Sequence, residues 1–454
     1  MSRHERFSFK TEQELAQRIK ELGLAIPLSD DLSVFHRRVK VNGSEAPNAF
    51  AVLPMEGCDS ESDGSPSPLV RRRYERFYSG GAGLIWWEAN AVTADGKANE
   101  LQMMLTDENK GSFTSLMADV KALALKKNGY VPLAVLQLTH SGRYSRPVGH
   151  TARPIIPQHD PILDVRMGLE DSYPVCSDEY LESLVEHYVH SALLAKEVGF
   201  DGVDIKACHR YLISELLASH TRPGRYGGSF ENRIRLLTDI VKAVRAACGD
   251  EFIVACRFNI FDAHPYPYGF GGSKEDLWTF DATEPLLLVK ALVEAGVTLL
   301  SNSAGNPYYI YPQVTRPFDL SSMGIPTPDE HPLESIERLF EFTRLVQEAA
   351  GDVPVVGNGY TWLRQFMVQA GSANLQNGWC SFVGMGRSSF AYPDAPSDVL
   401  RGGAMDPRKC CTTCSKCTQI MRDHGRTGCV VRDSAVYLPL FKEAREDAER
   451  RSST

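Results

Sequence analysis

The stretch that decides the fold is "SDEYLESLVEHYVHSALLAKEVGFDGVDIK", residues 177–206. Its N-terminal part predicts a helix, because apolar residues recur at the spacing that brings them onto one helix face. These residues are Leu181, Leu184, Val185, Tyr188 and Ala192. Ser177 stands where it can cap the start of the helix, and Gly199 stands where the helix should end. The apolar run "GFDGVDIK" then predicts a buried strand.

This unit of helix and strand recurs along the chain. Eight short apolar runs, separated by helical patterns, predict the strands of a parallel sheet. The runs are "AFAVLP" (49–54), "AGLIWWEA" (82–89), "VPLAVLQL" (131–138), "GFDGVDIK" (199–206), "EFIVACRF" (251–258), "GVTLLSNS" (296–303), "VPVVGNG" (353–359) and "WCSFVGMG" (379–386). Eight units in about 350 residues favour a closed (β/α)8 barrel, the TIM barrel, over an open sheet. We therefore expect an α/β chain with a helical extension at 1–45, the barrel at 46–404, and a cysteine-rich segment and tail at 405–454.

Composition and charge narrow the class of protein. The 454 residues carry a formal net charge of −8, which argues against a nucleic-acid surface. The one dense basic run, "VRRRYERF" at 70–77, predicts a solvated helix face. No apolar window reaches the roughly 20 residues that a membrane span needs, and the N-terminus lacks the apolar core of a signal peptide. We therefore expect a cytoplasmic protein, in which thiols bind metals or catalyse rather than form disulfides.

Polar side chains gather at one end of the predicted strands. The residues at or just past the carboxyl ends of these runs are Gln137, Lys206, Arg257, Asn302 and Asn358. Active sites of (β/α)8 barrels are built at that end. The sequence therefore predicts one site to which several strands contribute.

Two glycine-containing turns predict a phosphate site. "VVGNGYT" and "VGMGRSSF" contain the last two predicted strand ends, where barrels often bind phosphate on backbone N–H groups. Gly359 and Gly386 would let the backbone approach closely, and the guanidinium of Arg387 could pair with the phosphate. Neither stretch completes the GxGxxG pattern of a dinucleotide site. The same glycines would also suit tight turns.

The strand ends also offer groups for a planar heterocycle and for proton transfer. An arginine in a barrel mouth needs an anionic partner, and the N1–C2=O edge of a reduced flavin would suit Arg257, while Gln137 could offer a donor and an acceptor. "GVDIKACHRYLISELL" brings Lys206, His209 and Tyr211 close together in sequence. The first two could polarise a carbonyl group, and the tyrosine could act as an acid. The ordinary alternative is a helix start with a surface lysine, a hydrogen-bonded histidine and a core tyrosine.

Five thiols lie in "KCCTTCSKCTQIMRDHGRTGC", residues 409–429. Short spacers can bring three thiolates onto one face of a [4Fe–4S] cube, with a remote fourth ligand. The predicted ligands are Cys411, Cys414, Cys417 and Cys429. Cys411 is preferred to Cys410 because its spacing fits the pattern. A zinc ion, which more often draws paired ligands from two separate hairpins, is the alternative.

These motifs resemble the Old Yellow Enzyme family of NADH:flavin oxidoreductases. "FAVLPMEG", "QLTHSGR", "GFDGVDIKACHRYL", "RYGGSFENR", "ACRF" and "GMGR" occur in the family's order, and the cysteine tail is similar to its iron–sulfur branch, which includes 2,4-dienoyl-CoA reductase and trimethylamine dehydrogenase. The resemblance implies a barrel that binds FMN. It places Pro54, Met55, Ala89, Gln137 and Arg257 at the isoalloxazine ring, and Gly359, Gly386 and Arg387 at the FMN phosphate.

The catalytic stretch departs from the family pattern in two places. Lys206 stands where the family usually has histidine, and Arg210 where glycine is common. The implied reaction is reduction of the C=C bond of an α,β-unsaturated carbonyl compound, with Lys206 and His209 binding the carbonyl oxygen and Tyr211 protonating the α-carbon. The aromatic loops "NPYYIYP" and "HPYPYGF" suggest a substrate that contains a ring. The alternatives are an oxidative amine dehydrogenase of the trimethylamine dehydrogenase type and a non-catalytic flavin barrel with a zinc clip.

The source of electrons is a further expectation. In the resembling enzymes with two flavins, a domain that binds FAD and NAD(P)H follows the cluster. This chain stops at Thr454, shortly after Cys429. We therefore expect electrons from a separate donor protein or directly from NAD(P)H.

Overall fold

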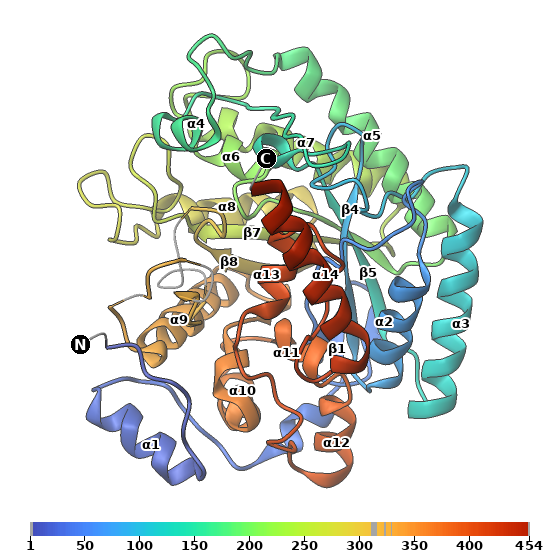
Figure 1. Cartoon of the computed structure of the whole chain (residues 1–454), viewed down its shortest axis with the longest axis vertical. Helices are drawn as coiled ribbons and strands as arrows, with labels where there is room; N and C mark the ends of the chain where they lie inside the picture. The colour runs from blue at the N-terminus through green and yellow to red at the C-terminus, as the bar shows by residue number, and fades with distance from the viewer. Residues whose placement is uncertain (1–2, 310–315, 322–323, 328, 453–454) are drawn as a thin grey trace.

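Eight parallel strands close into a barrel, in the order β10-β3-β4-β5-β6-β7-β8-β9, and helices surround it (Figure 1). The structure, a computed structural model, describes residues 3–309, 316–321, 324–327 and 329–452. The barrel strands are β3 (Phe50–Val52), β4 (Leu84–Ala91), β5 (Leu133–Thr139), β6 (Gly202–Ile205), β7 (Ile253–Phe261), β8 (Leu299–Ala304), β9 (Val355–Gly357) and β10 (Phe382–Met385). Each of the eight predicted runs overlaps one of them, which confirms the (β/α)8 barrel.

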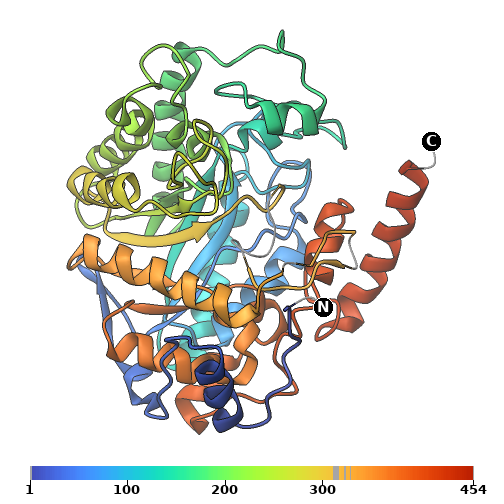
Figure 2. The same ribbon diagram turned by 90° about the vertical axis from the view of Figure 1, so that its left-hand side faces the viewer.

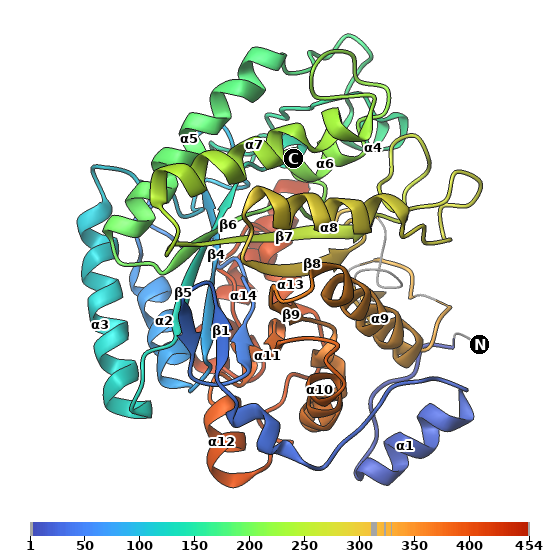
Figure 3. The same ribbon diagram turned by 180° about the vertical axis from the view of Figure 1, so that it is seen from behind.

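The strands are buried because side chains fill the barrel and helices cover its outside. Among the residues of the eight barrel strands, Arg257 alone is partly exposed. The longer outer helices, also seen from behind in Figure 3, are α2 (Pro68–Ser79), α3 (Lys110–Asn128), α5 (Asp178–Glu197), α7 (Phe230–Cys248), α8 (Thr283–Ala295), α9 (Pro332–Ala350) and α10 (Met367–Gln376). The shorter ones are α4 (Pro161–Met167), α6 (Leu212–Leu217), α11 (Arg387–Ala391), α12 (Ala395–Gly402), η1 (Leu32–His36), η2 (Gly142–Tyr144) and η4 (Tyr360–Phe366).

Helix α5 begins and ends where the sequence predicts. The Oγ of Ser177 accepts a hydrogen bond from the backbone N–H of Tyr180 at 3.2 Å, and Gly199 adopts a φ of +100° just after the helix. The predicted face is the one that packs on the barrel: Leu181, Leu184, Tyr188 and Ala192 are buried, and Val185 is partly buried.

The N-terminal extension contains a helix, α1 (Glu12–Glu21), and also a β-hairpin that the sequence analysis missed. The hairpin consists of β1 (Val39–Val41) and β2 (Ser44–Ala46). The side chain of Asn42 at its tip donates to the carbonyl oxygens of Asp250 and Phe252, at 2.6 and 3.2 Å, just before β7 begins. The hairpin therefore contacts the amino-terminal end of the barrel, opposite the predicted site. An Asn-Gly pair is a strong hairpin signal, and here it marks the turn.

The dense basic run lies in α2, but it is not the solvated face that the sequence analysis predicted. Arg73 is 3% exposed and forms an ion pair with Asp59 at 2.7 Å. Arg72 and Arg76 form ion pairs with Asp433, at 2.7 and 2.5 Å. These arginines therefore tie the C-terminal tail to the barrel.

The tail carries two helices, α13 (Lys416–Arg422) and α14 (Ser434–Ser452). Figure 2 shows them beside the barrel, with the end of α14 extending away from it. Only Tyr437 and Ala444 of α14 are buried. Within the described ranges, no helix is both long and apolar enough to cross a membrane.

Candidate active site

The carboxyl ends of the strands surround a cavity of about 160 Å³, called here the inner cavity. Most of the predicted catalytic and flavin-contacting residues line it: Pro54 and Met55 after β3, Gln137 in β5, Lys206, His209 and Tyr211 after β6, Arg257 in β7 and Arg387 in α11. Three others do not. Ala89 is buried in β4, and Gly359 and Gly386 directly precede η4 and α11. Of the other strand-end residues, Asn358 lines the cavity and Asn302 is buried in β8.

Lys206 is a buried residue with two partners, not the surface lysine of the ordinary alternative. Its Nζ lies 3.2 Å from Oε1 of Glu56, and the two side chains are 3% and 15% exposed. The same ammonium lies 4.0 Å from the centre of the Tyr211 ring. An ion pair and a cation–π contact therefore fix its position.

His209 lies opposite a serine, in an unusual backbone conformation. Its φ is +66°, in the left-handed region that residues with a Cβ rarely adopt. Its Nε2 lies 3.1 Å from the hydroxyl of Ser303, and its backbone N–H donates to Oδ1 of Asn259 at 3.2 Å. Burial, with nearby Lys206 and Arg257, lowers the pKa of His209 well below its usual range. The imidazole is therefore neutral at neutral pH and can donate one hydrogen bond to a ligand.

The next residue, Arg210, positions this loop without entering the cavity. Its φ is +59°, and left-handed backbone costs about 1–2 kcal/mol for a residue with a Cβ. Its buried guanidinium forms ion pairs with Asp160 at 3.2 Å and Asp262 at 3.1 Å. These contacts offset the strain and tie the loop after β6 to the loops after β5 and β7.

Three tyrosines contact one another beside the inner cavity: Tyr211 and Tyr308 line it, and Tyr144 stacks behind Tyr308. The hydroxyls of Tyr211 and Tyr308 lie 3.0 Å apart. The ring of Tyr308 stacks on Tyr144, with centroids 4.1 Å apart and planes at 22°. Burial and the Glu56 carboxylate raise the pKa of Tyr211 well above its usual range. Tyr211 therefore keeps its proton at neutral pH.

A buried carboxylate, Asp204 in β6, lies beside the inner cavity. It accepts hydrogen bonds from the side chains of Gln137 at 2.6 Å and Trp86 at 3.0 Å, and from the backbone N–H of Arg257 at 2.7 Å. One of the two N–H groups of the Gln137 amide is therefore engaged, which leaves its second N–H and its oxygen for a ligand. The prediction that this amide offers a donor and an acceptor to a heterocycle stays compatible with the structure.

Unpaired guanidinium groups indicate what the inner cavity would bind. The Nε atoms of Arg257, Arg316 and Arg387 are buried and have no hydrogen-bond partner among the described residues. Burial, with nearby Arg387 and Arg422, lowers the pKa of Arg316 well below its usual range. Arg316 is buried, Arg257 and Arg387 are partly buried, and Asp204 lies within electrostatic range of Arg257 alone among these three. Cations removed from water in this way gain an anionic partner in a negatively charged ligand. FMN, which has a phosphate and a ring edge that carries negative charge when reduced, fits this set of residues.

The cysteine-rich segment also lines the inner cavity. Cys417, Thr418, Met421, Arg422 and Thr427 line the inner cavity. Arg387 donates to the hydroxyl of Thr418 at 3.2 Å, and Arg422 donates to the carbonyl oxygen of Pro307 at 2.7 Å. The segment is therefore packed against the predicted flavin site.

Four thiols of this segment lie within electrostatic range of one another. Burial, with Cys417, Cys429 and Cys414, raises the pKa of Cys411. Cys410 has other neighbours, because its Sγ donates to the carbonyl oxygen of Asp406 at 3.4 Å. This arrangement fits the choice of Cys411 over Cys410.

No three His, Cys, Asp or Glu side chains lie close enough for one metal ion in the part of the chain that the structure describes. The role of the four thiols as metal ligands stays a prediction.

Several residues of the site escaped the sequence analysis. Glu56 stands in the quoted motif "FAVLPMEG", directly after a strand, and that position was the available signal. Tyr308 belongs to the aromatic loop "NPYYIYP", of which residues 310–312 lie outside the described ranges. The loop "HPYPYGF" contributes nothing to the inner cavity. No pattern indicated Arg316 or Tyr144.

The barrel and this site together define a class of protein, the flavin-dependent oxidoreductases. Residues 39–269, about half of the chain, match the model of the NADH:flavin oxidoreductase / NADH oxidase family. The chain belongs to this family of FMN-dependent enzymes, which confirms the resemblance drawn from the motifs at the level of the family.

Known proteins similar to this chain differ in length. The NADH oxidase of Thermoanaerobacter brockii is 26% identical over 377 residues, which are 80% of this chain and 50% of that protein. The structure of a 2-naphthoyl-CoA reductase complex has a TM-score of 0.68 at 20% identity, over 88% of this chain and 57% of the other. An old yellow enzyme homologue from Zymomonas mobilis has a TM-score of 0.60 at 21% identity, over 82% and 94%. The chain thus spans about half of the first protein, and the two structures support the fold.

Proposed function

We propose that this protein is an FMN-dependent ene-reductase that reduces the C=C bond of an α,β-unsaturated carbonyl compound. One observation carries the proposal: a buried ammonium, a neutral imidazole and a protonated tyrosine, from Lys206, His209 and Tyr211, line the cavity that also holds the unpaired arginines. The first two can bind an oxygen, and the third can release a proton to carbon.

Lys206 and His209 would bind the carbonyl oxygen of the substrate. The ammonium of Lys206 supplies a positive charge, which Glu56 holds in place at 3.2 Å. His209 adds a neutral N–H donor. Donors fixed before the reaction stabilise the negative charge that develops on the oxygen as the double bond is reduced.

Tyr211 would protonate the α-carbon. It keeps its proton until the carbanion forms, because burial and Glu56 raise its pKa. The hydroxyl of Tyr308, 3.0 Å away, can donate to the phenolate that remains. The stacked ring of Tyr144 keeps Tyr308 in place.

The cofactors complete the proposal. FMN, when bound, would supply hydride for the β-carbon, with its ring at Pro54, Met55, Gln137 and Arg257, and its phosphate near Arg387 and the turns at Gly359 and Gly386. A [4Fe–4S] cluster would supply one-electron transfer from a separate donor protein, whereas NAD(P)H would be a direct source of hydride for FMN. The ligands of the cluster would be Cys411, Cys414, Cys417 and Cys429.

The proposal is tested on protein purified without oxygen. One FMN with about four irons and four sulfides per chain is the expected content. The reduced flavin should be reoxidised by an enone, and Tyr211→Phe should slow that step by roughly 10²–10⁴-fold. Tyr266→Phe, at an exposed tyrosine outside the cavity, serves as the control. Flavin that no enone reoxidises would refute the ene-reductase, and zinc without sulfide would favour the zinc clip.

The amine dehydrogenase alternative is less well supported. An aromatic wall can bind a substrate ammonium by cation–π contact. Here Lys206 already places its own ammonium 4.0 Å from the centre of the Tyr211 ring. A second cation would be repelled from this position. Bleaching of the flavin by an amine under nitrogen would favour the alternative again.

A further inference from the structure

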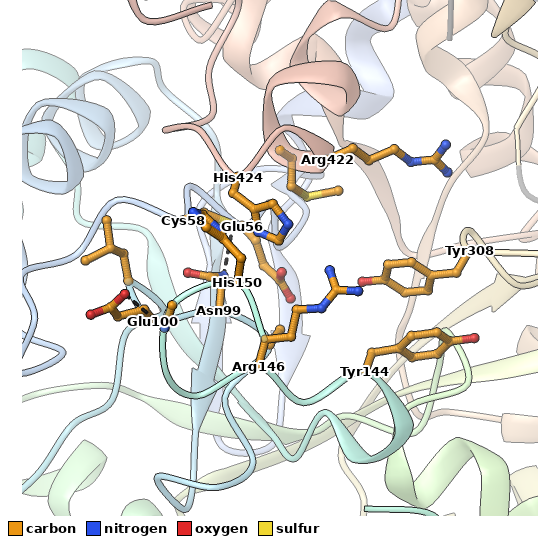
Figure 4. Close-up of a pocket in the computed structure, with 14 residues that line it drawn as sticks. Glu56, Cys58, Asn99, Glu100, Tyr144, Arg146, His150, Tyr308, Arg422 and His424 are labelled. Atoms are coloured by element: carbon orange, nitrogen blue, oxygen red, sulfur yellow. Dashed lines mark hydrogen bonds between the residues drawn. The ribbon is translucent and has the colours of Figure 1, made fainter. Parts of the chain in front are cut away.

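A second cavity of about 340 Å³, called here the outer cavity, adjoins the inner one (Figure 4). Glu56, Tyr308, Met421 and Arg422 line both cavities. Under the proposed function, the flavin ring and the reacting carbons of the substrate lie at the inner cavity, where Lys206, His209 and Tyr211 are. The outer cavity is then the space for the part of the substrate that extends beyond the reacting carbons.

The outer cavity contains a guanidinium group without a partner. Figure 4 shows Arg146 reaching into its middle, toward Tyr308. The Nε of Arg146 is buried and has no hydrogen-bond partner among the described residues. Arg422, at the border with the inner cavity, donates to a neutral group, the carbonyl oxygen of Pro307. Among the described residues, neither Arg146 nor Arg422 therefore forms an ion pair with a carboxylate.

The carboxylates of the outer cavity have other partners. Glu56 pairs with Lys206 at 3.2 Å. Glu100 accepts a hydrogen bond from the backbone N–H of Gly149 at 3.1 Å, and Figure 4 shows it on the opposite side of the cavity from Arg146. Neither carboxylate therefore neutralises Arg146.

Two histidines stand beside this arginine. The rings of His150 and His424 lie 4.5 Å apart, and both residues line the outer cavity. Burial, with Arg146 and His150, lowers the pKa of His424 to about 4. His424 is therefore neutral at neutral pH and can donate a hydrogen bond without repelling the arginine.

We propose, resting on the ene-reductase function, that the outer cavity binds an oxyanion group of the substrate, a carboxylate or a phosphate ester, remote from the reacting double bond. Arg146 is the specificity-determining residue, because it brings an unneutralised charge to a cavity that adjoins Lys206 and Tyr211. The guanidinium of Arg146 is partly buried, with its Nε withdrawn from water, so it gains a partner in a substrate that carries an anion and gains none in a substrate without one.

Three aryl enones that differ only in a remote substituent test the proposal: a carboxylate, its methyl ester and a phosphate ester. Arg146→Gln should raise the KM of an anionic enone by roughly 10–100-fold, because it removes a hydrogen bond between charged groups. The KM of the ester and the kcat values should change less than twofold. Arg153→Gln, at an exposed arginine further along the same loop, is the matched control. The anionic enone whose KM rises more in Arg146→Gln identifies the preferred group. Equal rises in KM for the ester and the anions would overturn the inference.

Calorimetry on the oxidised, FMN-loaded protein gives a readout without turnover. The wild type should bind the preferred anion at least tenfold more tightly than the ester, and Arg146→Gln should abolish that difference. If no enone is reduced, the ene-reductase proposal fails, whereas this difference in Kd would still support the anion site. Equal Kd values for ester and anions in the wild type would overturn the inference even for an active ene-reductase.

Discussion

Replacing Glu56 by glutamine should destabilise the protein strongly, and replacing Lys206 by methionine as well should cost less than the two single losses combined. The two charges lie 3.2 Å apart, with side chains 15% and 3% exposed. At that distance their attraction is about 5 kcal/mol for an effective dielectric constant of about 20. Removing one partner leaves a buried charge without compensation, and we expect a loss of about 3–5 kcal/mol for Glu56→Gln.

Urea denaturation of the FMN-loaded protein measures this coupling. The wild type, Glu56→Gln, Lys206→Met and the double variant form a cycle, followed by circular dichroism and by flavin fluorescence. The double variant should lose about 2–3 kcal/mol less than the two single losses combined. If the sum of the two single losses equals the loss of the double variant to within about 0.5 kcal/mol, the two side chains are not coupled. The ion pair then does not hold the Lys206 ammonium in place, and that part of the reasoning is refuted.

Three further predictions concern proton binding, the thiols and the tail. Burial lowers the pKa of His140 to about 4, against 6.5 for free histidine, so the stability it contributes is present above pH 6.5 and lost as the pH falls toward 4. That loss is about 3 kcal/mol, and His140→Gln should flatten stability curves over this pH range. Cys411→Ser should lower iron and sulfide content, whereas Cys410→Ser should leave both unchanged. Asp433→Asn should lower the free energy of unfolding by about 1 kcal/mol, because its arginine partners are about one-third exposed. It should lower iron content too, because its ion pairs with Arg72 and Arg76 hold in place a residue whose backbone N–H donates to the carbonyl oxygen of Cys429.

Each of these predictions has a control and a contrary outcome. His190→Gln, at a histidine whose side chain is 58% exposed, should leave the pH profile unchanged, and a parallel profile for His140→Gln would contradict the burial argument. Iron lost from Cys410→Ser but kept by Cys411→Ser would reverse the ligand assignment. Asp447→Asn, further along α14, controls for charge on that helix. Full iron content in Asp433→Asn would show that the ion pairs to α2 do not support the thiols.

The barrel could be predicted from the sequence because its signals are local. Each strand is a short apolar run, and α5 carries its cap, its apolar face and its terminating glycine within one stretch of chain. Residues at strand ends could be predicted as well, because a closed parallel barrel brings all of its carboxyl ends together. Lys206, Tyr211 and Arg257 were found in this way.

The remaining features depend on contacts between distant segments, which no local pattern reports. Arg73 looks like a surface residue until Asp59 and Glu88 are placed against it. Glu56 and Tyr308 join the site through partners about 100 or more residues away, Lys206 and Tyr211. That Arg146 forms no ion pair with the carboxylates of the outer cavity likewise becomes visible only when the distances are known.

The wall shared by the cysteine-rich segment and the inner cavity links two events that are usually treated as separate, metal loading and flavin retention. Cys417 lines this cavity together with Thr418 and Thr427, so the segment that would carry the cluster would also enclose the proposed FMN site. Under the cluster proposal, each cofactor orders a surface that the other one needs. A cell short of iron should then accumulate the protein without flavin as well. Iron scarcity would then remove both cofactors together, and would not leave a barrel that has lost its cluster but keeps a flavin that reacts with oxygen.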